Sequence, residues 1–123
     1  MNTTSKKPIF IFGLQSKNCD TMKKAMTWLS DNGVAYEFID YKKAGVAESH
    51  LADWNARAGW EKLLNKRGLM WKKLSEAERA DVDEAKALAL MAQYPALIKR
   101  PVLDTGSLLI VGFTPENYAE QLK

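Results

Sequence analysis

The chain of 123 residues has a single cysteine, Cys19, and a single histidine, His50. One cysteine cannot form an internal disulfide, which excludes a small secreted domain held together by disulfides and favours a reducing compartment. The two residues together cannot supply the ligands of a zinc centre, so no metal site is expected. The position three residues after Cys19 holds Met22, which also excludes a Cys-x-x-Cys redox switch.

The sequence also lacks long apolar runs and glycine-rich phosphate loops. No stretch approaches about 18 consecutive apolar residues, so no transmembrane helix is expected, and neither a GxGxxG pattern nor a P-loop occurs. The formal net charge of +3 is mild and does not require nucleic acid. Residues 1–7 are expected to form a disordered tail, and the apolar run after them is too short for a signal peptide. We therefore expect a cytoplasmic protein with neither a membrane nor a nucleic-acid partner.

The first part of the chain carries the pattern of a βαβ unit. Residues 8–14 form a continuous apolar run, which is typical of a strand buried on both faces. From Asp20 onward the apolar residues recur at helical spacing, and Asn32 with Gly33 marks the end of that helix. Residues 35–41 read as a second strand. Two strands joined through a helix predict a parallel pair with a right-handed crossover.

A helical insert is expected over residues 45–95. Residues 47–58 have the apolar spacing of a helix, and Pro95 ends the last helical run. Two capping patterns, each with a polar residue three positions before a glutamate, lie between them: Ser75 with Glu78, and Asp81 with Glu84. These patterns predict two further helix starts inside the insert.

The end of the chain predicts a hairpin and a terminal helix. Residues 100–113 read as two short strands around the turn DTGS, and the following helix should have Thr114 as N-cap and Pro115 as its first residue. The order β-α-β, helical insert, β-β-α predicts an α/β fold with the thioredoxin-like plan. We expect a mixed four-stranded sheet, a helical insertion between strands two and three, and one domain over residues 1–123.

On this layout Cys19 lies where the first strand hands over to the first helix. Helix N-terminal amides and the helix dipole stabilise a thiolate, which lowers a cysteine pKa. Lys17 adds positive charge, and Asn18 and Thr21 can donate hydrogen bonds to the sulfur. Free cysteines are more often buried packing residues, but the polar neighbours of Cys19 favour a reactive thiol.

Several segments together resemble a known family. These are NCDTMKKA around Cys19, KRP at 99–101, the VGF that ends the hairpin, and LLNKRGLMWKKL in the insert. Their order and spacing resemble the arsenate reductase–Spx (ArsC) family of thioredoxin-fold proteins, in its YffB-like branch, over nearly the whole chain. The resemblance implies that Cys19 is redox-active at the start of the first helix, and that Arg100 precedes a cis proline, Pro101. It also implies that Arg67 and Arg100 point toward the thiol and bind an anion.

One departure from the family concerns the oxyanion site. Arsenate reductases of this type carry a third arginine after the last hairpin. Here that region reads LIVGFTPEN, and the only basic residue after Arg100 is Lys123. A tetrahedral anion would therefore lose one charge-assisted donor, which counts against arsenate as the substrate.

The favoured hypothesis is a glutathione-dependent monothiol oxidoreductase with no bound cofactor and glutathione as co-substrate. The Cys19 thiolate would attack a mixed disulfide and pass the glutathionyl group to a second glutathione. Cations would bind the glutathione carboxylates, and a backbone edge expected to be free around Val102, next to Pro101, would pair with the tripeptide.

Two alternatives stay open. One is arsenate reduction with glutathione and glutaredoxin, using Cys19 as nucleophile and Arg67 and Arg100 as anion ligands. The other is a non-enzymatic, Spx-like regulator that binds RNA polymerase or another protein. A basic cluster in the insert is interpreted as the electropositive rim of the thiol site: Lys62, Lys66, Arg67, Lys72 and Lys73.

Overall fold

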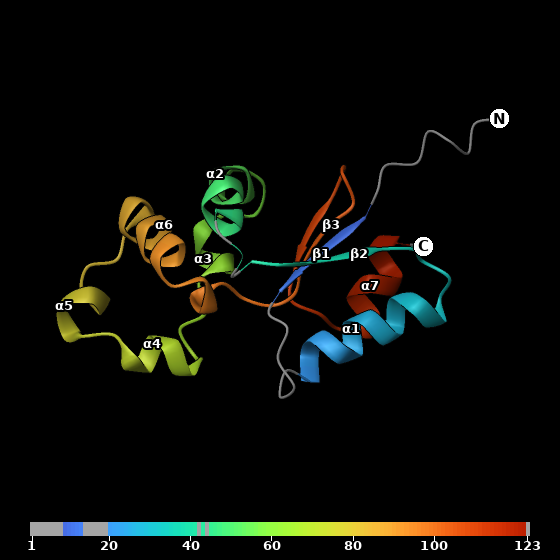
Figure 1. Cartoon of the computed structure of the whole chain (residues 1–123), viewed down its shortest axis with the longest axis horizontal. Coiled ribbons are helices and arrows are strands. Elements are labelled where there is room, and N and C mark those ends of the chain that lie inside the picture. The colour runs from blue at the N-terminus through green and yellow to red at the C-terminus, as the bar shows by residue number, and fades with distance from the viewer. Residues whose placement is uncertain (1–8, 14–19, 42, 44, 123) are drawn as a thin grey trace. The chain divides into compact units, whose positions relative to one another are not determined.

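The computed structural model describes residues 9–13, 20–41, 43 and 45–122, which form the helices and strands of Figure 1. In chain order these are β1 (Phe10–Gly13), α1 (Asp20–Asp31), β2 (Glu37–Asp40), α2 (Val46–Ala58), α3 (Trp60–Leu63), α4 (Leu69–Lys73), α5 (Glu76–Arg79), α6 (Glu84–Gln93), the 3₁₀ helix η2 (Pro95–Leu97), β3 (Val102–Asp104), β4 (Leu109–Val111) and α7 (Pro115–Leu122).

The chain divides into two compact units. The first, here called the sheet unit, runs to Ile39 and resumes at Arg100, and the second, the helical unit, spans Asp40–Lys99. The predicted helical insert, residues 45–95, falls inside the helical unit. The single-domain organisation stays a prediction.

The four strands lie in the order β2-β1-β3-β4. β1 and β3 are antiparallel, with Phe12 opposite Val102, and β3 and β4 are antiparallel, with Val102 opposite Val111. The helices α2 to α6 lie in the chain between β2 and β3. This is an α/β fold with a mixed four-stranded sheet and the thioredoxin-like plan, as the element order predicted.

Pairing on both sides of β3 corrects one expectation. The backbone around Val102 was expected to be free on one edge, but Val102 has Phe12 on one side and Val111 on the other. The hairpin folds β4 back along one side of β3, and β1 occupies the other side. The edge strands of the sheet are therefore β2 and β4. A peptide cannot pair with the backbone at Val102, because neighbouring strands occupy both sides of that residue.

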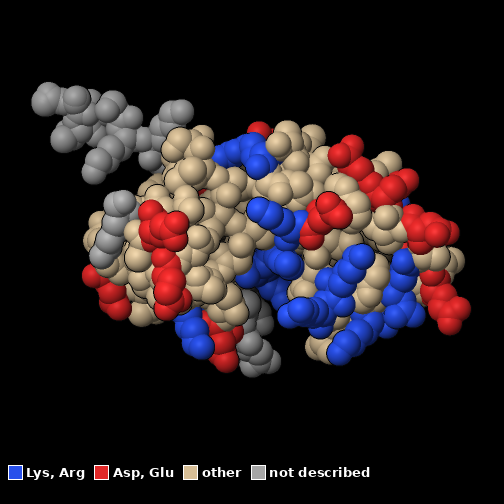
Figure 2. Space-filling model, turned by 180° about the vertical axis from the view of Figure 1, so that it is seen from behind, with Lys and Arg blue, Asp and Glu red and all other residues tan. Residues whose placement is uncertain are grey.

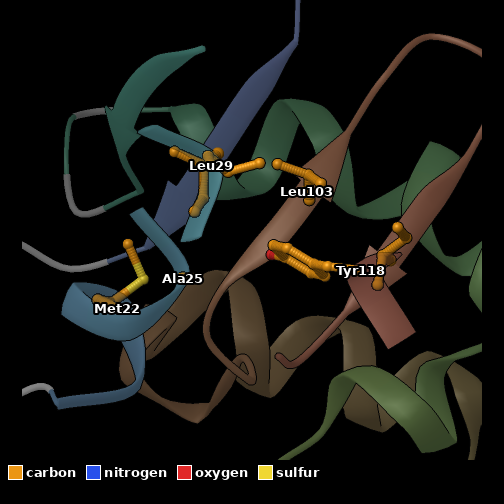
Figure 3. Packing of buried hydrophobic residues seen from close by; sticks show 7 residues of the cluster. Met22, Ala25, Leu29, Leu103 and Tyr118 are labelled. Carbon is orange, nitrogen blue, oxygen red and sulfur yellow. The ribbon is translucent and has the colours of Figure 1, made fainter. Parts of the chain in front are cut away.

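The core of the sheet unit follows from the helical spacing in α1. Met22, Ala25 and Leu29 are buried on one side of this helix. They pack in one cluster with Leu103 of β3 and Tyr118 of α7, as Figure 3 shows. In β1 both Ile11 and Phe12 are at most 2% exposed. Neighbouring strand residues point to opposite faces, so the apolar run is covered on both faces, as the sequence predicted.

The helical unit has a core of its own around Trp54, which is fully buried. Tyr41 lies edge-on to Trp54, and its hydroxyl donates to the carbonyl oxygens of Ile98 at 2.9 Å and Lys99 at 3.0 Å. These bonds hold the first residues of the unit against its last ones.

None of the helices in the described ranges has the length and apolarity needed to cross a bilayer.

The N-terminal helix caps agree with the sequence at two of the three predicted positions. Ser75 and Glu78 form the reciprocal capping box at the start of α5, and Thr114 Oγ1 accepts from Asn117 N at 3.1 Å at the start of α7. The prediction of a cap at Asp81 is wrong. Asp81 has a left-handed φ of 51° in the turn before α6, and Asp83 caps that helix by accepting from Lys86 N.

Tyr118 generates a test of core stability. Its side chain is fully buried, and within the described residues its hydroxyl has no hydrogen-bond partner. Burial raises the pKa of the Tyr118 hydroxyl above the usual tyrosine range. A raised folded-state pKa means that the associated stability is fully present below about pH 10, the usual tyrosine pKa, and is lost as the pH rises further.

We expect Tyr118→Phe to raise the free energy of unfolding by about 1 kcal/mol at neutral pH, because an unpaired buried hydroxyl is removed while the ring stays. The variant should also lose less stability than wild type above about pH 10. Urea unfolding at a series of pH values measures both effects, with Tyr36→Phe, at a partly exposed tyrosine of the same unit, as the control. A clear loss of stability in Tyr118→Phe at neutral pH would contradict the assignment.

Candidate functional site

The expected nucleophile, Cys19, directly precedes the first helix of the sheet unit in the sequence. α1 begins at Asp20, the residue that follows Cys19 in the chain. Cys19 itself, Lys17 and Asn18 lie outside the described residues. The described part of this helix start consists of Asp20 and Thr21, both of which are exposed.

The first turn of α1 packs directly against the end of β1. A Cβ atom built on Gly13 would lie 2.4 Å from Met22 Sδ and 2.6 Å from Met22 Cε. Contacts this short do not occur between real atoms, so the glycine leaves room that the methionine side chain fills. Met22 is buried, with 2% of its surface exposed. The contact brings the first turn of α1 close to the end of β1.

The end of β1 lies beside the start of β3. Phe12 pairs with Val102 in an antiparallel register. Gly13 follows Phe12 and Pro101 precedes Val102, so Gly13 and Pro101 lie at the same end of the strand pair. The Arg100–Pro101 peptide bond is cis, as the family resemblance implied. The Pro101 carbonyl accepts a hydrogen bond from Gly112 N at 2.8 Å, which ties this segment to the turn after β4.

The sheet unit thus brings several of the predicted site residues to one region. Met22 joins the first turn of α1, where Thr21 lies, to the end of β1, and β1 lies beside Pro101 and Val102. Arg100 precedes the cis bond and is partly buried, whereas Pro101 and Val102 are buried. Because the side chains of Pro101 and Val102 are buried, direct contact of these side chains with a solute is not supported.

Arg67 belongs to the helical unit. It lies between α3 and α4, is exposed, and its backbone N–H donates to Asn65 Oδ1 at 3.0 Å. Its contribution to an anion site with Arg100 stays a prediction from the resemblance. Within the described ranges, no group of three His, Cys, Asp or Glu residues is arranged to hold a metal ion.

A groove along α1 was missed by the sequence reasoning. It has a volume of about 610 Å³ and runs from Thr21 to Asp31 along α1, facing the start of α7. Its apolar lining comes from Trp28 and Phe113, whose rings both pack edge-on against Tyr118, with centroids 5.5 Å and 4.6 Å away. The feature of the sequence that could have indicated this groove is Trp28, an aromatic residue on the otherwise polar side of the predicted helix.

Comparisons with known proteins agree on one family. The sequence model described as the ArsC family matches residues 14–121. A solved structure of a protein named YffB is 50% identical, covers 94% of this chain and 99% of its own, and superposes with a TM-score of 0.85. An arsenate reductase (ArsC) related protein from Brucella melitensis is 45% identical, with coverage of 94% and 95% and a TM-score of 0.73. An uncharacterised protein of Haemophilus influenzae is 36% identical over 110 residues, which are 89% of this chain and 95% of that protein.

The contact between Gly13 and Met22 can be tested by a double-mutant cycle. Gly13 is not among the glycines with a positive φ, so alanine is compatible with its backbone and the expected effect is steric. We expect Gly13→Ala to lower the free energy of unfolding by about 1 to 2 kcal/mol, and Met22→Ala alone to lower it by about 2 to 5 kcal/mol. In the Met22→Ala background, Gly13→Ala should cause no further loss. Additive losses, measured by urea unfolding, would show that the two residues do not interact.

Proposed function

The chain belongs to the ArsC family, and on that premise we propose that it is a glutathione-dependent monothiol oxidoreductase acting through Cys19. The observation that carries the proposal is the start of α1 at Asp20, directly after the chain's single cysteine, with the first turn of this helix packed against β1 beside Pro101. A helix start offers unpaired backbone N–H groups and partial positive charge, both of which favour a thiolate.

The proposed reaction has two exchange steps. In the first, the Cys19 thiolate attacks the glutathione sulfur of a mixed disulfide R–S–S–G. A disulfide forms between Cys19 and glutathione, and R–S⁻ leaves and takes up a proton. In the second, the thiolate of another glutathione attacks this disulfide, which forms oxidised glutathione and restores the Cys19 thiolate. The mixed disulfide is reduced and glutathione is oxidised, and no other electron donor is needed.

In the proposal, positively charged side chains recognise the carboxylates of glutathione. The tripeptide carries two carboxylates, which arginine binds in a bidentate manner. Arg100 and Arg67 are the proposed carboxylate ligands, with Lys17, Asn18 and Thr21 supplying charge and hydrogen bonds near the sulfur. Because β3 is paired on both sides at Val102, strand addition at that residue is not part of the proposal. The proposed compartment is the cytoplasm, where glutathione keeps thiols reduced.

Arsenate reduction is the second candidate. It is favoured by the 45% identity to the arsenate reductase (ArsC) related protein from Brucella melitensis. It would use Cys19 as nucleophile, Arg67 and Arg100 as anion ligands, and glutathione with glutaredoxin as reductants. The absence of a basic residue between Arg100 and Lys123 leaves the anion with fewer charged donors than arsenate reductases of this type have. The same assay with arsenate in place of the mixed disulfide distinguishes the two reactions.

The first test is turnover of the mixed disulfide of cysteine and glutathione, with glutathione as reductant. We expect wild-type protein to accelerate formation of oxidised glutathione, and Cys19→Ser to abolish that acceleration because serine cannot form the intermediate disulfide. The Cys19→Ser protein should keep the wild-type circular dichroism spectrum. A folded wild-type protein that is no faster than the uncatalysed exchange would contradict the proposal.

The second test distinguishes a specific role of Arg100 from the effect of removing the positive charge of the adjacent Lys99. We expect Arg100→Ala to raise the KM for glutathione and to move the pH midpoint of Cys19 alkylation upward, since a cation near a thiolate lowers its pKa. Lys99→Ala removes an exposed charge one residue earlier and should change neither quantity. Arg100→Lys should restore the midpoint better than the KM, because lysine keeps the charge but not the bidentate geometry. Equal effects of the two alanine variants would indicate a general surface charge effect.

A further inference from the structure

The positive charge of the chain is concentrated in one short segment of the helical unit. Residues 62–73 contain five of the 18 Lys and Arg residues and none of the 15 Asp and Glu residues. The rest of the chain therefore has 13 basic residues against 15 acidic ones, a net charge of −2. The overall charge of +3 arises from this segment alone.

The cations of this segment point into solvent. Each of the five side chains is exposed, and within the described residues none of them forms an ion pair. Figure 2 shows Lys and Arg side chains gathered at the lower right, on the side where α4 lies, and Asp and Glu side chains along the right-hand margin. The unpaired cations are Lys62, Lys66, Arg67, Lys72 and Lys73.

An exposed leucine lies among these cations. Leu69, the first residue of α4, has 74% of its surface exposed. Residues three and four positions apart share one face of a helix, so Leu69, Lys72 and Lys73 lie on the same face of α4. On another side of α4 the Lys66 ammonium lies 5.6 Å from the centre of the partly buried Trp71 ring. Lys66 thereby extends the positive charge around the helix.

We propose that this face, called here the basic docking face and made of Leu69, Lys72 and Lys73, binds an acidic protein. The partner would place an apolar side chain or pocket on Leu69 and carboxylates opposite the lysines. An apolar contact surrounded by charged groups is the usual arrangement of a protein–protein interface. Complementary charge around it would accelerate association and select the partner.

The arrangement favours a protein over the two other acidic partners. Nucleic acid would engage the lysines through phosphates but has little apolar surface to cover Leu69. A membrane surface would accept both, but interfacial helices bury a continuous apolar face, and α4 is five residues long with one strongly exposed apolar side chain. The dipole of α4 favours Lys72 and Lys73 in its last turn, which accounts for two charges and leaves Leu69 unexplained.

The test uses defined probes and the full chain. One probe is a fluorescent helical peptide with a glutamate face and a leucine face, and a second has serine in place of each leucine. A DNA duplex and vesicles of phosphatidylglycerol are the competing acidic surfaces. Fluorescence anisotropy and vesicle sedimentation give the affinities at low and at physiological salt, since charge-based binding weakens as salt rises.

We expect the wild-type chain to bind the glutamate–leucine peptide more tightly than its serine counterpart. Leu69→Ser should weaken binding to the first peptide on the order of tenfold through loss of apolar burial and leave binding to the second unchanged. Lys72→Gln with Lys73→Gln should weaken binding to both. The matched controls are Leu108→Ser, at a second exposed leucine of the described residues, and Lys43→Gln with Arg79→Gln, two exposed cations of the helical unit; neither should change the affinity.

Three results would overturn the proposal. Equal affinity for the two peptides, with no effect of Leu69→Ser, would show that the face binds through non-specific charge alone and not through Leu69. Tighter binding of the DNA duplex than of either peptide, lost in the double lysine variant, would assign the face to nucleic acid. Vesicle binding that depends on Leu69 in the absence of peptide binding would assign it to a membrane surface. Circular dichroism of each variant verifies that a loss of affinity does not come from unfolding.

Discussion

The close approach of Met22 to Gly13 is the contact on which the candidate thiol site depends. A helix start influences a neighbouring thiol only if the helix is held in place, and α1 is held by its buried side. Met22 is the first residue of that side, and its sulfur occupies the space that a side chain on Gly13 would take. Packing of an apolar residue against a glycine thus positions the polar end of the helix.

The second constraint is the pairing of β3 on both sides. A strand with two neighbours has no backbone groups left for a peptide ligand, so the sheet cannot recognise glutathione at Val102 by extending its ladder. The proposed recognition of glutathione therefore relies on groups outside the ladder. Arg100 is the residue proposed for it, and Pro101, which follows Arg100, lies at the same end of the sheet as Gly13. The proposed function therefore depends more on charge than on backbone pairing, which is why arginine and lysine substitutions test it.

Local patterns in the sequence predicted most of the fold. The buried strand β1, the apolar side of α1, the Ser75 capping box and the Thr114 cap all follow from interactions between residues close in sequence. The free edge at Val102 and the cap at Asp81 were predicted wrongly. The partners of a strand come from distant segments, and the choice between Asp81 and Asp83 depends on the backbone conformation of the turn. The groove beside Trp28 was missed because it needs α7 next to α1, and the exposure of Leu69 could not be distinguished from an ordinary core position of α4.

The distribution of charge suggests that the two units have different tasks. The proposed thiol reaction needs cations for two carboxylates and a sulfur, and Arg100, Arg67 and Lys17 are the residues proposed for that role. Four further lysines within residues 62–73 exceed that need, and two of them, Lys72 and Lys73, share a helix face with the exposed Leu69. The dipole of α4 favours Lys72 and Lys73 in its last turn, but an exposed leucine contributes nothing to the core, so folding does not explain the exposure of Leu69. The proposed acidic partner would cover both Leu69 and the two lysines. The two proposals therefore fall on different units: partner binding on the helical unit, and the thiol reaction at the start of α1 in the sheet unit.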